Sequence, residues 1–327
     1  MKRIKEALKD GNFARLYIFH GRERYLLEYY QEQLVKTVIG DGFEEFNLHK
    51  FDGRGMDLKE LDMAINSPPV MAPLKLIIVN DFDIFKSTDK ELVAELIADI
   101  PEFCVVVFGY DAVPFAPDKR QKLYKTLEKA AQIIAFEAQS ESDLIAWVKR
   151  RFSAEGKEIF TADAQHLIYI SGGLMNNMAN EIAKIAAFAK VDKIDRRMID
   201  QMVTPVVEFS VFKVTDAIKG RDFDTALSIL DNLFYQNQEP IAILALLTHN
   251  FCQMLSAKVG VDNLGKLWGF RSDFQIRQTT SVAARFTRRQ LERAVKLCAQ
   301  TDLDMKSKGL DSKDCLRMMI CQLAINN

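Results

Sequence analysis

The turn after the first apolar run of the sequence is where a nucleotide would bind if this chain hydrolysed one. The run ends at Phe19, and the stretch from His20 to Leu26 follows it. A phosphate-binding loop needs the pattern Gly-x-x-x-x-Gly-Lys-Ser/Thr, because its amides cradle phosphates, its lysine reaches them and its hydroxyl holds Mg²⁺. This turn has one glycine and no Lys, Ser or Thr, and the acidic Glu23 and Glu28 would repel phosphate. The sequence therefore predicts that this chain does not hydrolyse ATP.

A second residue that could do chemistry is Asp81, which follows the apolar run from Leu76 to Val79. In nucleotide-hydrolysing enzymes an aspartate at the end of such a strand holds Mg²⁺. Without a phosphate loop the structural interpretation is favoured. We expect Asp81 to end a buried strand and to cap or solvate a turn.

No other arrangement of side chains in the sequence predicts catalysis or metal binding. The pattern Gly-x-Ser-x-Gly and the pattern His-Glu-x-x-His are both missing, and the four histidines lie far apart. None of the five cysteines forms a Cys-x-x-Cys pair, and an odd number of cysteines suits the reducing cytoplasm. We therefore expect no catalytic residue, no metal and no cofactor, and a cytoplasmic protein.

Composition places the chain among ordinary globular proteins of two or three domains. It has 327 residues, of which 48% are hydrophobic and 27% charged, with a net charge of −1. This balance excludes a basic chain that holds nucleic acid by bulk charge alone. The longest apolar runs are far too short to span a bilayer, and Met1 to Glu6 begins an amphipathic helix, so neither a membrane span nor a signal peptide is expected.

The elements change character near residue 139. Before it, apolar strand patterns alternate with helical patterns, which predicts a parallel sheet covered by helices on both faces. After Glu137 only helical spacing remains, with an expected break from Gly260 to Gly269. The fold class expected is α/β followed by all-α, with domains at 1–139, 140–206 and 207–327. Among the individual elements, the sequence predicts a strand from Phe46 to Phe51 and a helix from Asp118 to Lys129.

Several segments in their order along the chain resemble the delta subunit family of bacterial DNA polymerase III. They are Tyr17 to Leu26, Ser67 to Ala72 followed by Leu76 to Val79, Asp118 to Lys125, Asn180 to Ile185, and Glu239-Pro240 with Ile243-Leu244. This resemblance covers nearly the whole chain. It implies an AAA+-like parallel-sheet domain with a degenerate P-loop, a small helical lid domain and a C-terminal helical collar domain for oligomerisation.

The resemblance also implies a function. Delta subunits bind the ring-shaped β sliding clamp and open it for loading onto primed DNA, without ATP hydrolysis of their own. The implied partners are the clamp, the clamp-loader ATPase (gamma/tau) and delta-prime subunits, and primer–template DNA, with no membrane. The chain itself would carry no catalytic site, although it would be a subunit of the DNA-directed DNA polymerase holoenzyme.

The family inserts an apolar pair, presented just before the third strand, into a pocket on the clamp. At matching positions those residues are Val70 and Met71, with Pro69 beside them. An apolar pair between prolines cannot easily retreat into the core, and exposed apolar tips on ordered loops are often functional. The alternative is that Val70 and Met71 are the first residues of the core strand.

Basic residues supply the candidates for DNA contact. Members of the family touch phosphates through helix amino termini and basic side chains, and the matching candidates are Lys119, Arg120 and Lys122. The alternative is a solvated helix face, which is the commoner role of a charge run.

Two other functions remain open from the sequence. One is an ATP-using AAA+ enzyme with an atypical loop. The other is a clamp-loader subunit at a different position in the ring. The delta-prime type carries clustered cysteines and a Ser-Arg-Cys motif, and this sequence has neither.

Overall fold

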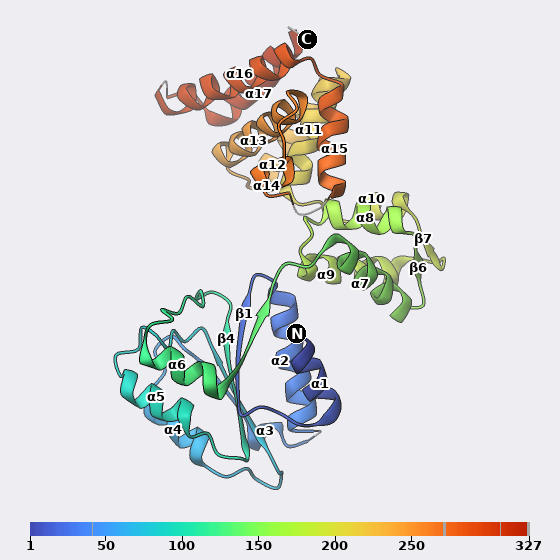
Figure 1. Ribbon diagram of the computed structural model, residues 1–327. Helices are drawn as coiled ribbons and strands as arrows, with labels where there is room; N and C mark the ends of the chain where they lie inside the picture. The colour runs from blue at the N-terminus through green and yellow to red at the C-terminus, as the bar shows by residue number, and fades with distance from the viewer. Residues whose placement is uncertain (41, 271–272, 308, 326–327) are drawn as a thin grey trace. The chain divides into compact units, whose positions relative to one another are not determined.

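The computed structural model describes residues 1–40, 42–270, 273–307 and 309–325. It divides into two compact units, Met1–Gln139 and Ser140–Asn327 (Figure 1). Each unit has its own hydrophobic core and is described by itself.

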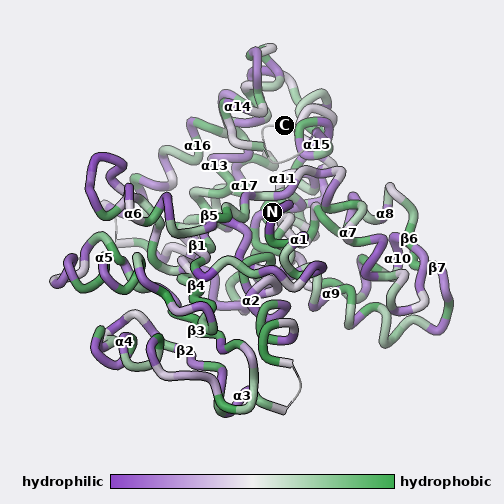
Figure 2. Tube along the Cα trace, turned by 60° about the horizontal axis from the view of Figure 1, so that its bottom comes forward, coloured by the Kyte–Doolittle hydropathy of each residue, from purple (hydrophilic) through white to green (hydrophobic). Residues whose placement is uncertain are grey.

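The first unit is built on a five-stranded parallel sheet of order β2-β3-β4-β1-β5. Its strands are β1 (Leu16–Gly21), β2 (Leu48–Asp52), β3 (Lys75–Asn80), β4 (Cys104–Tyr110) and β5 (Ala131–Phe136). The three inner strands are almost entirely buried, as expected where helices cover both faces of a parallel sheet. Figure 2 shows the hydrophobic residues along these central strands.

Helices cover the two faces of this sheet as two separate layers (Figure 1). The helices are α1 (Lys2–Asp10), α2 (Arg24–Val38), α3 (Glu44–Asn47), α4 (Leu58–Asn66), α5 (Lys90–Ala98) and α6 (Lys122–Ala130). On one face Ile4 of α1 and Leu34 of α2 pack in a core with Phe19. On the other face α4, α5 and α6 pack against the sheet, for example through Leu61 and Leu127.

The second unit is helical. It contains α7 (Glu141–Ala154), α8 (Thr161–Ile170), α9 (Met175–Phe188), α10 (Arg196–Met202), α11 (Val207–Gly220), α12 (Phe223–Tyr235), α13 (Pro240–Lys258), α14 (Leu264–Trp268), α15 (Asp273–Ala284), α16 (Arg288–Ser307) and α17 (Ser312–Ile325). The expected fold class, a parallel α/β region followed by a helical region, is confirmed.

Helix α13 is the central helix of this unit. Within the described residues it is the one helix long and apolar enough to cross a membrane, judged by length and composition alone. It packs against α11, α15, α16 and α17, and it buries Leu247 and Phe251 in their shared core. Its apolar composition is therefore explained by its place in the bundle.

Four local expectations were wrong. The strand expected from Phe46 begins only at Leu48, because residues 44–47 form α3, whose first turn carries two glutamates that suit a helix amino terminus. The helix expected from Asp118 begins at Lys122, because Asp118 instead closes a turn by accepting the Arg120 N–H.

The other two corrections concern the helical unit. The segment expected as a break between 260 and 269 contains α14, and α15 follows it. A two-residue parallel ladder, β6 (Glu158–Ile159) with β7 (Lys193–Ile194), lies where helices alone were expected. Strands of two residues are too short to leave a period in the sequence.

Candidate functional site

The turn after β1 is closed by the neighbouring strand β5. Only Arg22 and Glu23 separate the end of β1 from the first residue of α2. Gly21 has φ +133°, and a Cβ atom there would lie 2.2 Å from the Phe136 carbonyl oxygen. That carbonyl also accepts the Glu23 N–H at 2.9 Å. This turn is therefore shorter than a phosphate-binding loop, and the Glu23 amide is already bonded to β5.

Acidic groups surround Arg24, the first residue of α2 after this turn. Arg24 Nε donates to Glu28 Oε1 at 2.7 Å, and its Nη1 lies 3.1 Å from Asp111 Oδ2. Two carboxylates thus already pair with the guanidinium at the amino end of α2. A phosphate would meet their negative charge there.

Asp81 stabilises a loop. Its Oδ1 accepts the backbone N–H groups of Asp111, Ala112 and Val113 at 2.9, 2.8 and 3.0 Å. Asp81 itself has φ +57°, and its N–H donates to Gly109 O at 2.7 Å. The interpretation of Asp81 as a turn-capping residue is confirmed.

The segment between α4 and β3 is held at its start by a buried lysine. Lys75 is 1% exposed, and its Nζ donates to Ala64 O, Ser67 O and Ser67 Oγ. It also lies 5.4 Å from the centre of the Phe103 ring. Burial lowers the pKa of this ammonium group. Lys75 thereby joins the first residue of β3 to the carboxyl end of α4, where carbonyl groups lack helical partners.

The same segment is held at its middle by Asn47. This asparagine is buried, and its side chain accepts the Val70 N–H at 2.8 Å and donates to Val70 O at 2.9 Å. Asn47 is the last residue of α3 and directly precedes β2, which pairs with β3. Sequence reasoning missed it because the contact joins residues 23 positions apart.

The tip of the segment presents apolar side chains. Met71 is 86% exposed and Val70 46% exposed, and Met71 has φ +52°. Val70 and Met71 thus lie outside the strand, which begins at Lys75, so the alternative that placed them in the core strand is wrong. Pro69 is partly buried beside them.

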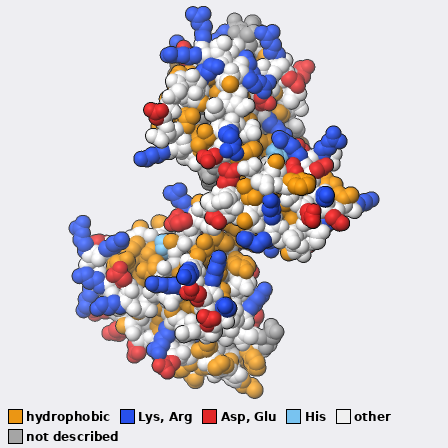
Figure 3. Space-filling view, turned by 45° about the vertical axis from the view of Figure 1, so that its right-hand side comes forward, with side chains coloured by type: hydrophobic (Ala, Val, Ile, Leu, Met, Phe, Trp, Pro, Cys, Tyr) orange, Lys and Arg blue, Asp and Glu red, His pale blue; other side chains and the backbone are white. Residues whose placement is uncertain are grey.

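Phe46 adds an exposed aromatic side chain to the apolar side chains at this end of the sheet. It is 56% exposed and directly precedes Asn47. Figure 3 shows hydrophobic side chains gathered at the end of this unit where Figure 1 labels α3. Sequence reasoning did not assign Phe46 a function, because it was expected to lie in a strand.

The three basic candidates lie elsewhere in the same unit. Lys119 and Arg120 are exposed in the turn before α6, and Lys122 is exposed on its first turn. α6 starts on the side of the carboxyl ends of the strands, whereas residues 67–74 precede β3 at the amino ends. The structure therefore places the apolar and the basic candidates at opposite edges of the sheet.

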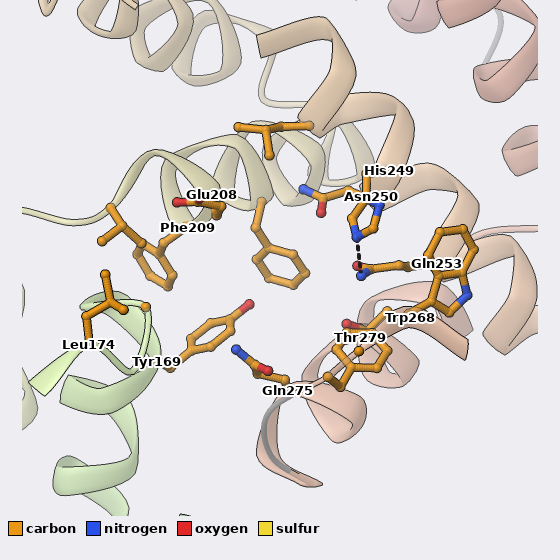
Figure 4. Close-up of a pocket in the computed structure, with 16 residues that line it drawn as sticks. Tyr169, Leu174, Glu208, Phe209, His249, Asn250, Gln253, Trp268, Gln275 and Thr279 are labelled. Atoms are coloured by element: carbon orange, nitrogen blue, oxygen red, sulfur yellow. Dashed lines mark hydrogen bonds between the residues drawn. The ribbon is translucent and has the colours of Figure 1, made fainter. Parts of the chain in front are cut away.

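The helical unit contains a separate cavity of about 340 Å³, lined by residues of α8, α11, α13, α14 and α15 (Figure 4). Tyr169, Phe209 and Trp268 contribute aromatic walls, and His249 bonds to Gln253 at 2.8 Å. Its lining includes no nucleophile paired with a base. In the part of the chain that is described, no group of three or more His, Cys, Asp or Glu could hold a metal ion.

Comparison with known families decides the relationship of the chain. The family model "DNA polymerase III, delta subunit" matches residues 17–137, and "DNA polymerase III delta subunit, C-terminal domain" matches residues 208–323. Together they cover well over half of the sequence. The chain belongs to the DNA polymerase III delta subunit family.

Relatives of the delta family match over most of their length. The chain is 26% identical to the DNA polymerase III subunit delta of Bacillus subtilis, over 99% of this chain and 97% of that protein. It is 20% identical to the probable DNA polymerase III subunit delta of Aquifex aeolicus, over 75% of this chain and 71% of the relative. The solved structure of the B. subtilis DNA clamp loader delta protein shares its fold, with a TM-score of 0.61 at 23% identity over 99% of both chains.

Proposed function

We propose that this chain is the delta subunit of a DNA polymerase III clamp loader, and that it binds and opens the sliding β clamp for loading onto primed DNA. The observation that carries this proposal is the apolar pair of Val70 and Met71, exposed on a segment whose backbone is fixed by Asn47 and Lys75. Membership of the delta family supports the choice of the sliding clamp as the partner.

The geometry of the pair suits insertion into a pocket. An exposed methionine adapts its shape to an apolar cavity, and a few buried anchors carry most of the energy of an interface. Because the backbone that carries Met71 is already ordered, little conformational freedom is lost on binding. Val70, Met71 and Pro69 are therefore the residues that we assign to clamp contact.

The chain would perform this role without hydrolysing ATP. The closed turn after β1 and the use of Asp81 as a loop cap support this part of the proposal. The energy for opening the ring would come from binding, coordinated by the gamma/tau ATPase subunits and delta-prime. A binding assay with labelled ATP tests it, since saturable binding to the isolated chain would favour an AAA+ ATPase instead.

The helical unit would provide the lid at 140–206 and the collar at 207–327. In support, helices α7 to α10 pack on one another, and α11, α12, α13, α15, α16 and α17 share a single core. Tyr235 is 86% exposed at the end of α12, an apolar exposure that suits assembly with other subunits.

DNA contact is the least direct part of the proposal. Lys119, Arg120 and Lys122 are exposed, and none of their side chains has an ion-pair partner among the described residues. Unpaired cations at a helix amino terminus suit phosphate contact.

The double variant Val70→Ala/Met71→Ala tests the clamp contact by surface plasmon resonance with an immobilised bacterial clamp. We expect binding to fall at least a hundredfold, on the order of the loss of two interface anchors, with unchanged thermal stability. Met318→Ala is the matched control, because Met318 is 57% exposed but lies on α17 of the other unit. Undiminished binding of the double variant would overturn the assignment of these residues.

A further inference from the structure

One buried side chain joins the short helix α3 to the apolar segment before β3. Asn47 is 0% exposed, and it makes hydrogen bonds to both backbone groups of Val70, at 2.8 and 2.9 Å. An amide side chain offers one accepting oxygen and one donating nitrogen. Through these two bonds Asn47 pairs with the Val70 backbone in the way that a residue on a neighbouring antiparallel strand would.

Asn47 is itself fixed on both sides along the chain. Its backbone N–H donates to Phe43 O at 3.1 Å within α3. The next residue, Leu48, begins β2 and pairs with Leu76 of β3. The position of Val70 is thus set by the sheet, through Asn47.

The rest of the segment is tied in the same way. Lys75 holds Ser67 at its start, and the Lys75 N–H donates to Phe103 O at 2.9 Å at its end. Met71 follows Val70 directly, in a left-handed conformation that a non-glycine residue keeps only where its surroundings enforce it. Its side chain takes no part in this network, since it is 86% exposed.

We propose that Asn47 is a positioning residue that holds Val70 and Met71 in their contact geometry before the partner arrives. The inference rests on the proposed function, because the partner is the sliding clamp. A segment released from Asn47 would adopt the contact geometry only part of the time, and its apparent affinity for the clamp would be the intrinsic affinity multiplied by that fraction.

The variant that tests this is Asn47→Leu, which keeps nearly the same shape in a buried site but removes both bonds to Val70, together with the longer bond of 3.3 Å from the same amide to Phe43 O. Its matched control is Asn66→Leu, which makes the same chemical change on the exposed surface of α4. In the described structure the Asn66 side chain bonds only to Asp62, at 2.7 and 3.1 Å. Should Asn47→Leu fold poorly, Asn47→Asp retains the acceptor for the Val70 N–H and replaces the donor with a second acceptor oxygen, which faces the carbonyl oxygens of Val70 and Phe43.

Two measurements are needed. Amide hydrogen exchange of Val70 in the isolated protein should become at least about tenfold faster in Asn47→Leu, since the N–H loses its partner. Clamp affinity should fall about ten- to a hundredfold. Combining Asn47→Leu with Met71→Ala should cost less than the sum of the two losses, because both act through one contact. A purely structural role would lower stability without this coupling.

The outcomes separate this inference from the proposed function. If the wild-type chain does not bind the clamp, the proposed function fails, and the exchange rate still decides whether Asn47 fixes the segment. If the clamp binds and Asn47→Leu binds as tightly as the wild type or as Asn66→Leu, Asn47 is not a positioning residue. Full additivity with Met71→Ala would also overturn the inference.

Discussion

Gly21 lies so close to Phe136 that a Cβ atom on residue 21 would stand 2.2 Å from the Phe136 carbonyl oxygen. The two residues are paired in register at the ends of β1 and β5. Because β5 pairs with β1 as far as Gly21, its end closes over the turn that leads into α2. In nucleotide-binding α/β folds the turn after the first strand surrounds a phosphate, whereas in this chain the same turn joins the ends of two strands.

The first prediction concerns this contact. Gly21→Ala should lower the free energy of unfolding by about 2–4 kcal/mol, because alanine meets backbone atoms and must adopt a strained φ. Urea denaturation of the variant and the wild type measures the change. Gly55→Ala is the control, because Gly55 has φ +84° but a Cβ atom there would meet no other atom within 4 Å. It should lose only about 1 kcal/mol, the cost of the left-handed conformation.

Met71 allows binding and stability to be separated. Because Met71 has φ +52°, Met71→Gly should be more stable to urea than Met71→Ala by about 0.5–1 kcal/mol. Both variants lose the same exposed side chain, so both should lose clamp affinity to a similar degree in surface plasmon resonance. Equal stability of the two variants would show that the backbone at this residue is not held in the left-handed conformation.

The sheet and the helical region could be predicted because they depend on local patterns. The run from Leu76 to Val79 is continuous and β-branched, and it forms a strand buried on both faces. The absence of a phosphate loop was equally readable, since Gly21 to Arg24 lacks the residue types that the loop needs. Each of these inferences used residues adjacent in sequence.

The hydrogen bonds that hold the segment before β3 in place could not be predicted, because they join residues that lie apart in the sequence. Asn47 looked like a polar position in an alternating strand, whereas its side chain is consumed by Val70. No pattern in the sequence singles out Lys75, yet its side chain is buried and its ammonium group bonds to Ser67. Neither role leaves a period or a motif in the sequence, since each depends on how β2 and β3 pair.

The burial of the Lys75 ammonium group predicts a specific pH dependence of the free energy of unfolding. Burial lowers its pKa below the ordinary value of 10.5. Between the folded-state pKa and 10.5 the unfolded chain binds more protons than the folded chain, so stability rises with pH in this window. The free energy of unfolding of the wild type, relative to Lys75→Met, should therefore increase as the pH rises towards 10.5. Parallel profiles from urea denaturation between neutral and alkaline pH would contradict the assignment.

Phe46 should contribute to clamp binding without contributing to stability. Because its side chain is 56% exposed, its truncation to alanine leaves no buried cavity. It directly precedes Asn47, whose side chain holds the segment before β3. Phe46→Ala should weaken clamp binding by about tenfold, the loss typical of an aromatic anchor at an interface, and leave the melting temperature unchanged. Tyr29→Ala is the control, because Tyr29 is 41% exposed on α2 of the same unit. Equal affinities of the two variants would restrict the contact to the segment before β3.

The basic turn before α6 is tested by the salt dependence of DNA binding. In a reconstituted clamp loader, replacing Lys119, Arg120 and Lys122 with alanine should weaken primer–template binding and lower the salt slope by up to about 0.9 for each phosphate that the variant no longer touches. The control replaces Lys5, Lys9 and Lys36, which are exposed on α1 and α2, and removes the same charge. Clamp binding by the isolated chain should stay unchanged in both variants, since the apolar segment lies at the opposite edge of the sheet. An equal loss of DNA affinity in the two variants would mean that net charge, and not this turn, determines the contact.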